Sequence, residues 1–249
     1  MIPKEIEQIE LKYLNKFYHF LKFAEDEMMI GFQTKEKIKD DWYGLYSSGI
    51  SDFAVGAERI IYSLLNGKGI GQPNSSPVGA DLFFEVNDAF IHIDLKTVEA
   101  DGNIGDYTKN IFVGTNQNSY KAEIKKANGK SFEPPRFYEP SLPTFYNNGK
   151  DNEKICLSYF ITVLYSKEHL DILNINILSM PNGALEPHYK SRPLSAGKNP
   201  DKTRFNFKEV NKFELLENMP SRVKVVFFDE NMKNEYKKRL TFFNSLYLK

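Results

Sequence analysis

The chain has 249 residues, enough to bury a substantial core as one large α/β domain. Hydrophobic residues make up 41% and aromatic residues 14%, a composition that excludes an intrinsically disordered chain. The 33 basic residues are balanced by 33 acidic ones. Any surface that binds nucleic acid must therefore be local rather than spread over the whole protein.

The only cysteine, Cys156, excludes an intramolecular disulfide and a cysteine-based zinc site, and it suits a reducing compartment. It lies in the apolar run ICLSYFITVLY, so we interpret it as a buried structural thiol rather than a nucleophile. The N-terminal residues MIPKEIEQIE contain no apolar signal core, and no stretch reaches about 18 apolar residues. We therefore expect a cytoplasmic protein with no membrane partner.

Apolar periodicity predicts two helices in the first part of the chain. Over residues 3–29 apolar residues recur at spacings of three and four, which is typical of a long amphipathic helix. A second helix is expected over residues 51–66, with Gly67 as its C-cap. Glu58 lies at the border of its apolar face, roughly 100° from the centre. From there its carboxylate can point toward a neighbouring sheet.

The connector NGKGIGQPNSSP matches neither common glycine-rich phosphate-binding pattern, so we do not interpret it as a phosphate loop. The stretch PVGADLFFEVNDAFIHIDLKT then predicts two strands joined by a turn at Asn87-Asp88. Later strands are expected at residues 155–165, 171–179 and 223–228, and a closing helix at residues 231–246. This order predicts an α/β fold with a sheet flanked by helices.

The predicted hairpin carries charges that a half-buried sheet would not be expected to hold. Because side chains alternate along a strand, Asp94 and Lys96 share one face with His92. Pairing about the turn brings Asp81 nearly opposite Asp94. Facing carboxylates repel each other, and Mg²⁺, which binds one or two carboxylates together with water and phosphate oxygens, offsets that repulsion. Lys96 could then hold the attacking water or stabilise charge on a phosphate.

A simpler interpretation is a surface hairpin whose polar face is wet, with Asp94 and Lys96 offsetting each other at little gain. Taken alone, Asp-x-Lys is a common pattern. The spacing from Asp81, the strands on both sides and Glu58 on the preceding helix favour the metal-site hypothesis.

These residues resemble the PD-(D/E)xK nuclease motif: Asp81 is followed 13 residues later by Asp94-Leu95-Lys96, with Pro77 ahead of Asp81 instead of adjacent to it. Chain length, the helix-rich N-terminus and the variable second half are similar to type II restriction endonucleases in particular. The resemblance implies a restriction-endonuclease-like core, a central mixed β-sheet flanked by helices.

The same resemblance implies roles for individual residues. Asp81 and Asp94 would bind Mg²⁺, and the backbone carbonyl of Leu95 could add a ligand. Lys96 would position the hydrolytic water, and Glu58 would complete or support the metal site.

Two other polar residues of the hairpin have lesser expected roles. Glu85 is the alternative carboxylate if Asp81 proves structural. His92 fits a partly buried hydrogen-bonding residue better than the general base.

Residues 101–121 are rich in amides and hydroxyls and are candidates for DNA contacts. Asn116, Gln117 and Asn118 could hydrogen-bond base edges, while Lys109 and Lys121 could reach phosphates. A solvated loop that caps a following helix is the alternative.

The segment HYKSRPLSAGKNPDKTRFNFK carries six cations against one acidic residue and supplies local positive charge. Its candidates for DNA contacts are Arg192, Lys198, Lys202 and Arg204, with Arg204 the first choice for a guanine contact. A flexible solvated loop is the alternative.

We therefore expect one endonuclease domain over residues 1–249, with an N-terminal helical part (1–49), a catalytic core (50–180) and a DNA-contacting loop with a C-terminal strand and helix (181–249). The expected function is that of a type II restriction endonuclease, which hydrolyses double-stranded DNA at a specific sequence with Mg²⁺ and leaves 5′-phosphate and 3′-hydroxyl ends.

A palindromic site would call for a two-fold symmetric homodimer. A companion DNA methyltransferase is expected in the same system, without a stable complex. Two alternatives are a structure-specific DNA repair or recombination nuclease, and a non-catalytic DNA-binding protein.

Overall fold

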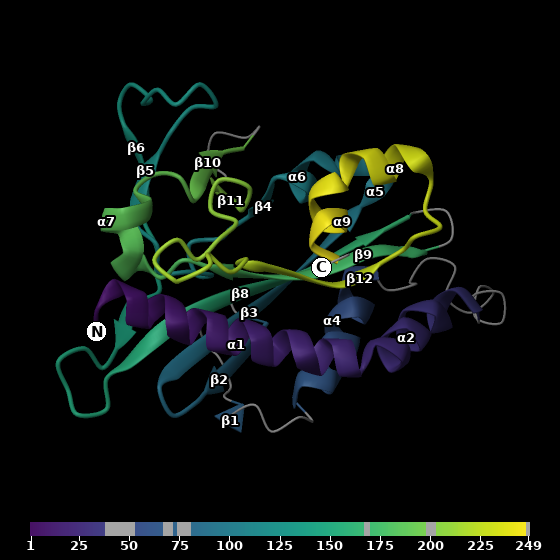
Figure 1. Cartoon of the computed structure of the whole chain (residues 1–249), viewed down its shortest axis with the longest axis horizontal. Coiled ribbons are helices and arrows are strands. Elements are labelled where there is room, and N and C mark those ends of the chain that lie inside the picture. Colours follow the sequence, from purple (N-terminus) through teal and green to yellow (C-terminus); the bar gives the residue numbers. More distant parts are fainter. Residues whose placement is uncertain (38–52, 67–71, 74–80, 167–169, 198–202, 248–249) are drawn as a thin grey trace.

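The computed structural model describes residues 1–37, 53–66, 72–73, 81–166, 170–197 and 203–247 (Figure 1). Its helices are α1 (Pro3–Phe23), α2 (Glu25–Lys37), α4 (Phe53–Asn66), α5 (Ala100–Asn103), α6 (Gly105–Thr108), the 3₁₀ helix η1 (Gly183–Leu185), α7 (Glu186–Tyr189), α8 (Asn234–Arg239) and α9 (Thr241–Tyr247). Within these ranges, no helix combines the length and apolar character needed to cross a membrane.

The strands are β1 (Gln72–Pro73), β2 (Leu82–Glu85), β3 (Ala89–Glu99), β4 (Asn110–Phe112), β5 (Ala122–Ile124), β6 (Arg136–Tyr138), β7 (Phe145–Tyr146), β8 (Lys154–Tyr165), β9 (Ile172–Met180), β10 (Leu194–Ala196), β11 (Thr203–Asn206) and β12 (Val223–Phe228). They form a seven-stranded sheet, a three-stranded sheet (β10-β11-β4) and the β5–β6 hairpin.

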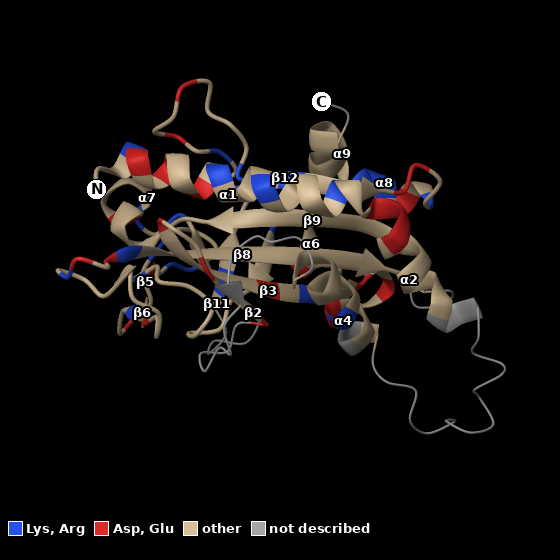
Figure 2. Ribbon diagram, turned by 90° about the horizontal axis from the view of Figure 1, so that it is seen from below, with Lys and Arg blue, Asp and Glu red and all other residues tan. Residues whose placement is uncertain are grey.

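The seven-stranded sheet forms the centre of the molecule, in the order β1-β2-β3-β8-β9-β12 with β7 beside β8. β3 runs parallel to β8, and the other strand pairs described for this sheet are antiparallel. β9 is buried along its whole length and contains no charged residue, so Figure 2 shows it as a tan strand between β8 and β12. Such a strand needs cover on both faces of the sheet. The predicted α/β fold with a central mixed sheet is confirmed.

Helices cover both faces of this sheet (Figure 1). On one face α1 packs against β8, where the hydroxyl of Tyr159 donates to the backbone carbonyl of Glu10 in α1 at 2.8 Å. α4 covers the same face, where the ring of Phe53 stacks at 4.2 Å on Tyr165. On the opposite face α6 inserts Tyr107, which packs at 5.2 Å against Phe243 of α9. Aromatic side chains therefore carry the contacts between the helical layers and the sheet.

Two predicted helices are each divided in the structure. The helix expected over residues 3–29 is α1 followed by α2, with a break at Ala24 (φ −98°, ψ 21°). The helix expected over residues 231–246 is α8 followed by α9, with a break at Leu240 (φ −99°, ψ 18°). Both break residues are apolar and buried. They continue the apolar periodicity, so the pattern gives no sign of the change in direction.

The remaining predicted elements lie close to their expected positions. β8 and β9 begin and end within one residue of the predicted strands, and β12 has the predicted bounds. α4 ends at Asn66, as predicted, and residues 51–52 lie outside the described ranges.

A buried polar network joins α6 to the sheet. The hydroxyl of Tyr107 donates to Asn174 Oδ1 at 2.6 Å and accepts from Asn176 Nδ2 at 2.8 Å. Thr162 donates to Asn176 Oδ1 at 2.7 Å, so the amide is bonded at both ends. A buried hydrogen-bond network in which every member is paired favours a single packing arrangement of the core.

Tyr107→Phe is expected to lower the free energy of unfolding by about 1–2 kcal/mol, because the buried amides of Asn174 and Asn176 each lose one hydrogen bond. Urea unfolding followed by circular dichroism measures this change. Tyr18→Phe, at a half-buried position of α1, is the matched control and should cost less than about 0.5 kcal/mol. Equal effects of the two changes would contradict a role for the network.

Candidate active site

The hairpin of β2 and β3 has the register that a turn at Asn87-Asp88 predicted. Leu82 pairs with Ile93 and Glu85 with Phe90, so the same register brings Asp81 opposite Asp94. Asp81 is exposed, immediately before β2, and its Oδ2 accepts a hydrogen bond from the Leu95 N–H at 2.8 Å. The carboxylate of Asp81 is thereby fixed beside the middle of β3.

Asp94 is buried, with 5% of its surface exposed. Its Oδ2 forms an ion pair with the ammonium of Lys96, and its Oδ1 accepts from Gln117 Nε2 at 2.7 Å. The Lys96 ammonium lies 5.8 Å from the ring centroid of Phe112. The alternative of a solvated surface hairpin does not fit Asp94, because protein groups surround its carboxylate.

The position of Asp94 disfavours its negative charge. Burial raises the pKa of Asp94 to about 7; the ammonium of Lys96 opposes that rise, and the facing carboxylate of Asp81 adds to it. Among the described residues, the ammonium of Lys96 pairs with Asp94, and the carboxylate of Asp81 lies opposite Asp94. A further cation between the carboxylates would relieve the repulsion.

α4 brings Glu58 and Tyr62 to the same region. Both are half-buried and lie one helical turn apart. Burial raises the pKa of Tyr62, and the negative charges of Asp81 and Glu58 raise it further, as expected for a hydroxyl close to both carboxylates. Tyr62 was not among the residues predicted from the sequence. Its position four residues after Glu58 places both side chains on one face of the helix, and this spacing could have identified it.

The other polar residues of the hairpin lie apart from Asp94 or are closed to solvent. Glu85, at the opposite end of β2, pairs with Lys154 at 2.7 Å. His92 is buried, and its Nε2 lies 2.9 Å from the hydroxyl of Tyr146. Burial lowers the pKa of His92 to about 4, so the ring is neutral at pH 7. The prediction of a hydrogen-bonding rather than a basic histidine agrees with these contacts.

The three neighbouring amides expected at base edges have different surroundings. Gln117 holds Asp94, as described, and its Oε1 accepts from the Gly114 N–H at 2.6 Å. Asn118 is buried, and its Nδ2 donates to the hydroxyl of Tyr138 at 2.8 Å. Asn116 is half-buried and lines a pocket beside the site. Of the three, Asn116 is therefore the one placed to meet a ligand.

The lysines predicted to contact DNA have different surroundings. Lys109 is exposed, and Lys121 forms an exposed ion pair with Glu139 at 2.7 Å. Lys198 and Lys202 lie outside the described residues.

Both candidate arginines bind carboxylates of the same chain. Arg192 makes two hydrogen bonds of 2.7 Å to Glu214. Arg204 binds Asp106 of α6 through Nε at 2.9 Å and Nη2 at 2.8 Å. Each guanidinium is thus already bound to a carboxylate of its own chain.

The family of the chain follows from a comparison with family models. The model for the N-terminal domain of the type II restriction enzyme MwoI matches residues 2–169, and the model for the central domain of the same enzyme matches residues 172–228. The chain belongs to this family of type II restriction enzymes. Its activity is that of a site-specific deoxyribonuclease, as the sequence predicted.

Solved structures show the same fold. The restriction endonuclease BglI, bound to its DNA recognition sequence, is similar with a TM-score of 0.69 and 16% identity over 91% of this chain and 92% of its own. The tetrameric restriction endonuclease SfiI, bound to cognate DNA, has a TM-score of 0.67 and 15% identity over 93% of this chain and 88% of its own. Curated proteins give no match. The predicted restriction-endonuclease-like core is confirmed.

The two matched regions of this MwoI-family enzyme share one sheet. The boundary between them falls between β8 and β9, which pair side by side. β9 and β12 of the second region therefore complete the sheet that carries the Asp94 strand of the first.

Membership in this family indicates dependence on a divalent metal ion. In the part of the chain described here, no three His, Cys, Asp or Glu side chains already gather as a metal cluster. The oxygen donors at hand still fit a hard divalent cation, because two carboxylates face each other and one of them, Asp94, is buried.

Proposed function

We propose that Asp81, Asp94 and Lys96 form the active site at which this restriction enzyme hydrolyses a phosphodiester bond of double-stranded DNA. The observation that supports this most directly is the buried carboxylate of Asp94, opposite Asp81 and in contact with Lys96. Perturbed acidic groups beside a lysine are typical of catalytic sites.

We propose Mg²⁺ as the metal, held by Asp81 and Asp94, with the carbonyl of Leu95 and the carboxylate of Glu58 as further oxygen donors. When bound, it would stabilise negative charge on the phosphate and make water more acidic. The Lys96 ammonium, kept in place by Asp94, would donate a hydrogen bond to the attacking water or to the phosphate. Attack in line with the 3′ oxygen would leave a 5′-phosphate and a 3′-hydroxyl.

We also propose a surface that contacts DNA and a homodimeric assembly. Lys109 and Lys121 are candidates for phosphates, Asn116 for a base edge, and Arg192, Lys198, Lys202 and Arg204 for further contacts. A homodimer would let two active sites cut the two strands of a palindromic sequence. Residues 1–249 would act as one endonuclease domain, since β9 and β12 complete the catalytic sheet.

The wider setting follows from this chemistry. A companion DNA methyltransferase would protect the host DNA without a stable complex. The enzyme would act on DNA inside the cell, and it would therefore be located in the cytoplasm.

The test is to digest a sequenced DNA with the purified protein and Mg²⁺ and to map both ends of every product. We expect discrete fragments with a shared sequence at the cut and ends that DNA ligase rejoins. A smear, or cutting only at branched junctions, would support a structure-specific nuclease instead. Binding without cutting in Mg²⁺ or Mn²⁺ would support a non-catalytic DNA-binding protein.

A further inference from the structure

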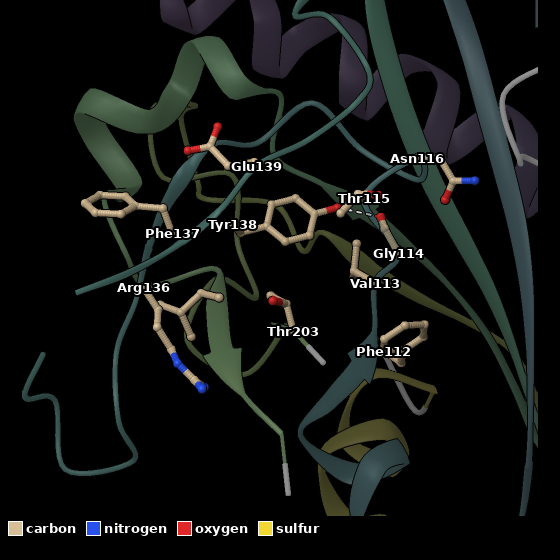
Figure 3. A pocket seen from close by; sticks show the side chains of 11 residues that line it. Phe112, Val113, Gly114, Thr115, Asn116, Arg136, Phe137, Tyr138, Glu139 and Thr203 are labelled. Atoms are coloured by element: carbon tan, nitrogen blue, oxygen red, sulfur yellow. Dashed lines mark hydrogen bonds between the residues drawn. The ribbon is translucent and has the colours of Figure 1, made fainter. Parts of the chain in front are cut away.

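A pocket of ≈ 680 Å³ lies beside the proposed active site, between β4 with the loop after it, the β5–β6 hairpin and β11 (Figure 3). Its wall combines hydroxyl, amide, guanidinium, carboxylate and aromatic groups. The residues used below are Phe112, Gly114, Asn116, Arg136, Phe137 and Tyr138.

The wall of this pocket is connected to both functional groups of the catalytic strand. Gly114 of the wall donates its N–H to Gln117 Oε1 at 2.6 Å, and Gln117 Nε2 donates to Asp94 Oδ1 at 2.7 Å. Phe112, also in the wall, lies 5.8 Å from the Lys96 ammonium. A shift of this wall would therefore move contacts of Asp94 and Lys96 together.

The Gly114 segment is held closely on its other side. The hydroxyl of Tyr138 donates to the Gly114 carbonyl, the dashed line in Figure 3, and accepts from Asn118 Nδ2 at 2.8 Å. A Cβ at Gly114 would meet Asn116 Oδ1 at 3.0 Å and the Gln117 side chain at 3.3 Å. Such tight packing transmits displacement instead of absorbing it.

The groups around the pocket suit base edges of duplex DNA. An asparagine amide matches adenine and an arginine guanidinium matches guanine, and the wall offers one of each in Asn116 and Arg136. Phe137 is 56% exposed and Phe112 is 38% exposed, so apolar surface faces solvent beside these polar groups. Thymine methyl groups and sugars make contacts with surface of this kind.

We propose that this pocket receives base edges of the recognition sequence, and that Gln117 is a positioning residue that links the filled pocket to the orientation of Asp94. The proposal rests on the proposed function and adds to it a specificity pocket and its connection to the catalytic carboxylate. A correct base sequence would set the Gly114 segment, and through Gln117 the carboxylate, in the arrangement that supports cleavage.

The test compares Gln117→Met, which keeps the side-chain volume and removes the amide, with the unchanged enzyme. Single-turnover cleavage is measured on the cognate duplex and on duplexes with one base pair altered. We expect the cleavage rate on the cognate duplex to fall about 10- to 100-fold, because the variant loses a hydrogen bond to a charged group. The fall on altered duplexes should be smaller. Cognate affinity without metal should remain nearly unchanged, whereas the unfolding temperature should fall by a few degrees, because two hydrogen bonds of Gln117 are lost.

Asn116→Ala tests the pocket itself. Without metal, we expect it to weaken binding of the cognate duplex by about 10-fold or more and to relax the preference at one base pair. Asn128→Ala, an exposed amide in the turn of the β5–β6 hairpin, is the matched control and should change neither property.

Several results would overturn the proposal. An equal rate loss of Gln117→Met on every duplex would show a purely structural role. An unchanged rate would show that Gln117 does not act through Asp94. If the unchanged enzyme cuts no DNA, the proposed function fails, and unaltered binding by Asn116→Ala would separately reject the pocket.

Discussion

Asp94→Asn is expected to lower the rate of DNA cleavage in Mg²⁺ by at least about 10³-fold, because it removes the buried carboxylate on which the proposed metal site and the Lys96 ammonium both depend. The change keeps the size of the side chain and still allows contact with Gln117. Single-turnover digestion of a short duplex that contains the mapped site measures the rate.

The same variant should keep its fold and bind DNA at least as tightly without metal. DNA affinity arises mainly from cations that meet phosphates, and Asp94→Asn removes a negative charge close to the proposed position of the scissile phosphate. Since burial raises the pKa of Asp94 to about 7, the charged carboxylate costs stability above that pH. Asp94→Asn should therefore unfold no earlier than the unchanged protein at pH 8 without divalent ions.

Glu85→Gln is the matched control, because it removes a carboxylate from the same hairpin at the end that faces Lys154. It should retain cleavage within about threefold, as expected for a site away from the chemistry. Loss of cutting by Glu85→Gln together with full cutting by Asp94→Asn would reject the proposed assignment and favour Glu85 as the catalytic carboxylate.

The part of the site that the sequence could predict depends on local geometry. Strand alternation places Asp94 and Lys96 on one face, and a turn at Asn87-Asp88 sets the partner of each residue in the hairpin. Both rules act over a few residues and need no knowledge of the remaining fold. They were sufficient to place Asp81 opposite Asp94.

Contacts between distant segments could not be predicted in the same way. Gln117 reaches Asp94 from a loop 23 residues away, and an amide among other amides carries no mark of that partner. Arg204 in a basic segment suggests a DNA contact, yet its guanidinium binds Asp106, 98 residues away. In both cases tertiary packing decides which of several equivalent polar groups a side chain meets.

The same limit applies to α1. The apolar residues that recur along it include the buried side chains of Tyr13, Phe17 and Leu21. The apolar pattern did not predict that Glu7 and Glu10 are also buried, since periodicity assigns charged residues to the solvent face. Their partner is Arg222, more than 200 residues away.

Arg222 is the centre of this buried charge cluster. It is 0% exposed, its Nη1 donates to Glu10 Oε2 at 2.8 Å, and its Nη2 donates to Glu7 Oε1 at 3.0 Å. The guanidinium lies 4.2 Å from the ring centroid of Phe213 and contacts the hydroxyl of Tyr189. Burial opposes its charge, but the neighbouring carboxylates outweigh burial and raise the pKa of Arg222.

The two carboxylates also bind backbone groups of other segments. Glu10 Oε1 accepts from the Asn182 N–H at 2.7 Å, and Glu7 Oε2 accepts from the Leu215 N–H at 2.8 Å. The cluster thus ties α1 to the loops after β9 and before β12. Removing its cation would disturb all of these contacts.

Arg222→Met is expected to lower the free energy of unfolding by about 3–5 kcal/mol, because it leaves two buried carboxylates without their cation. Urea unfolding gives this value as a lower midpoint at unchanged slope. Adding Glu10→Gln to Arg222→Met should recover part of the loss, since one uncompensated charge is removed. Arg192→Met, which breaks the exposed pair with Glu214, is the matched control and should cost no more than about 1 kcal/mol. Equal midpoints for Arg222→Met and Arg192→Met would show that the buried cluster contributes no more than a surface pair.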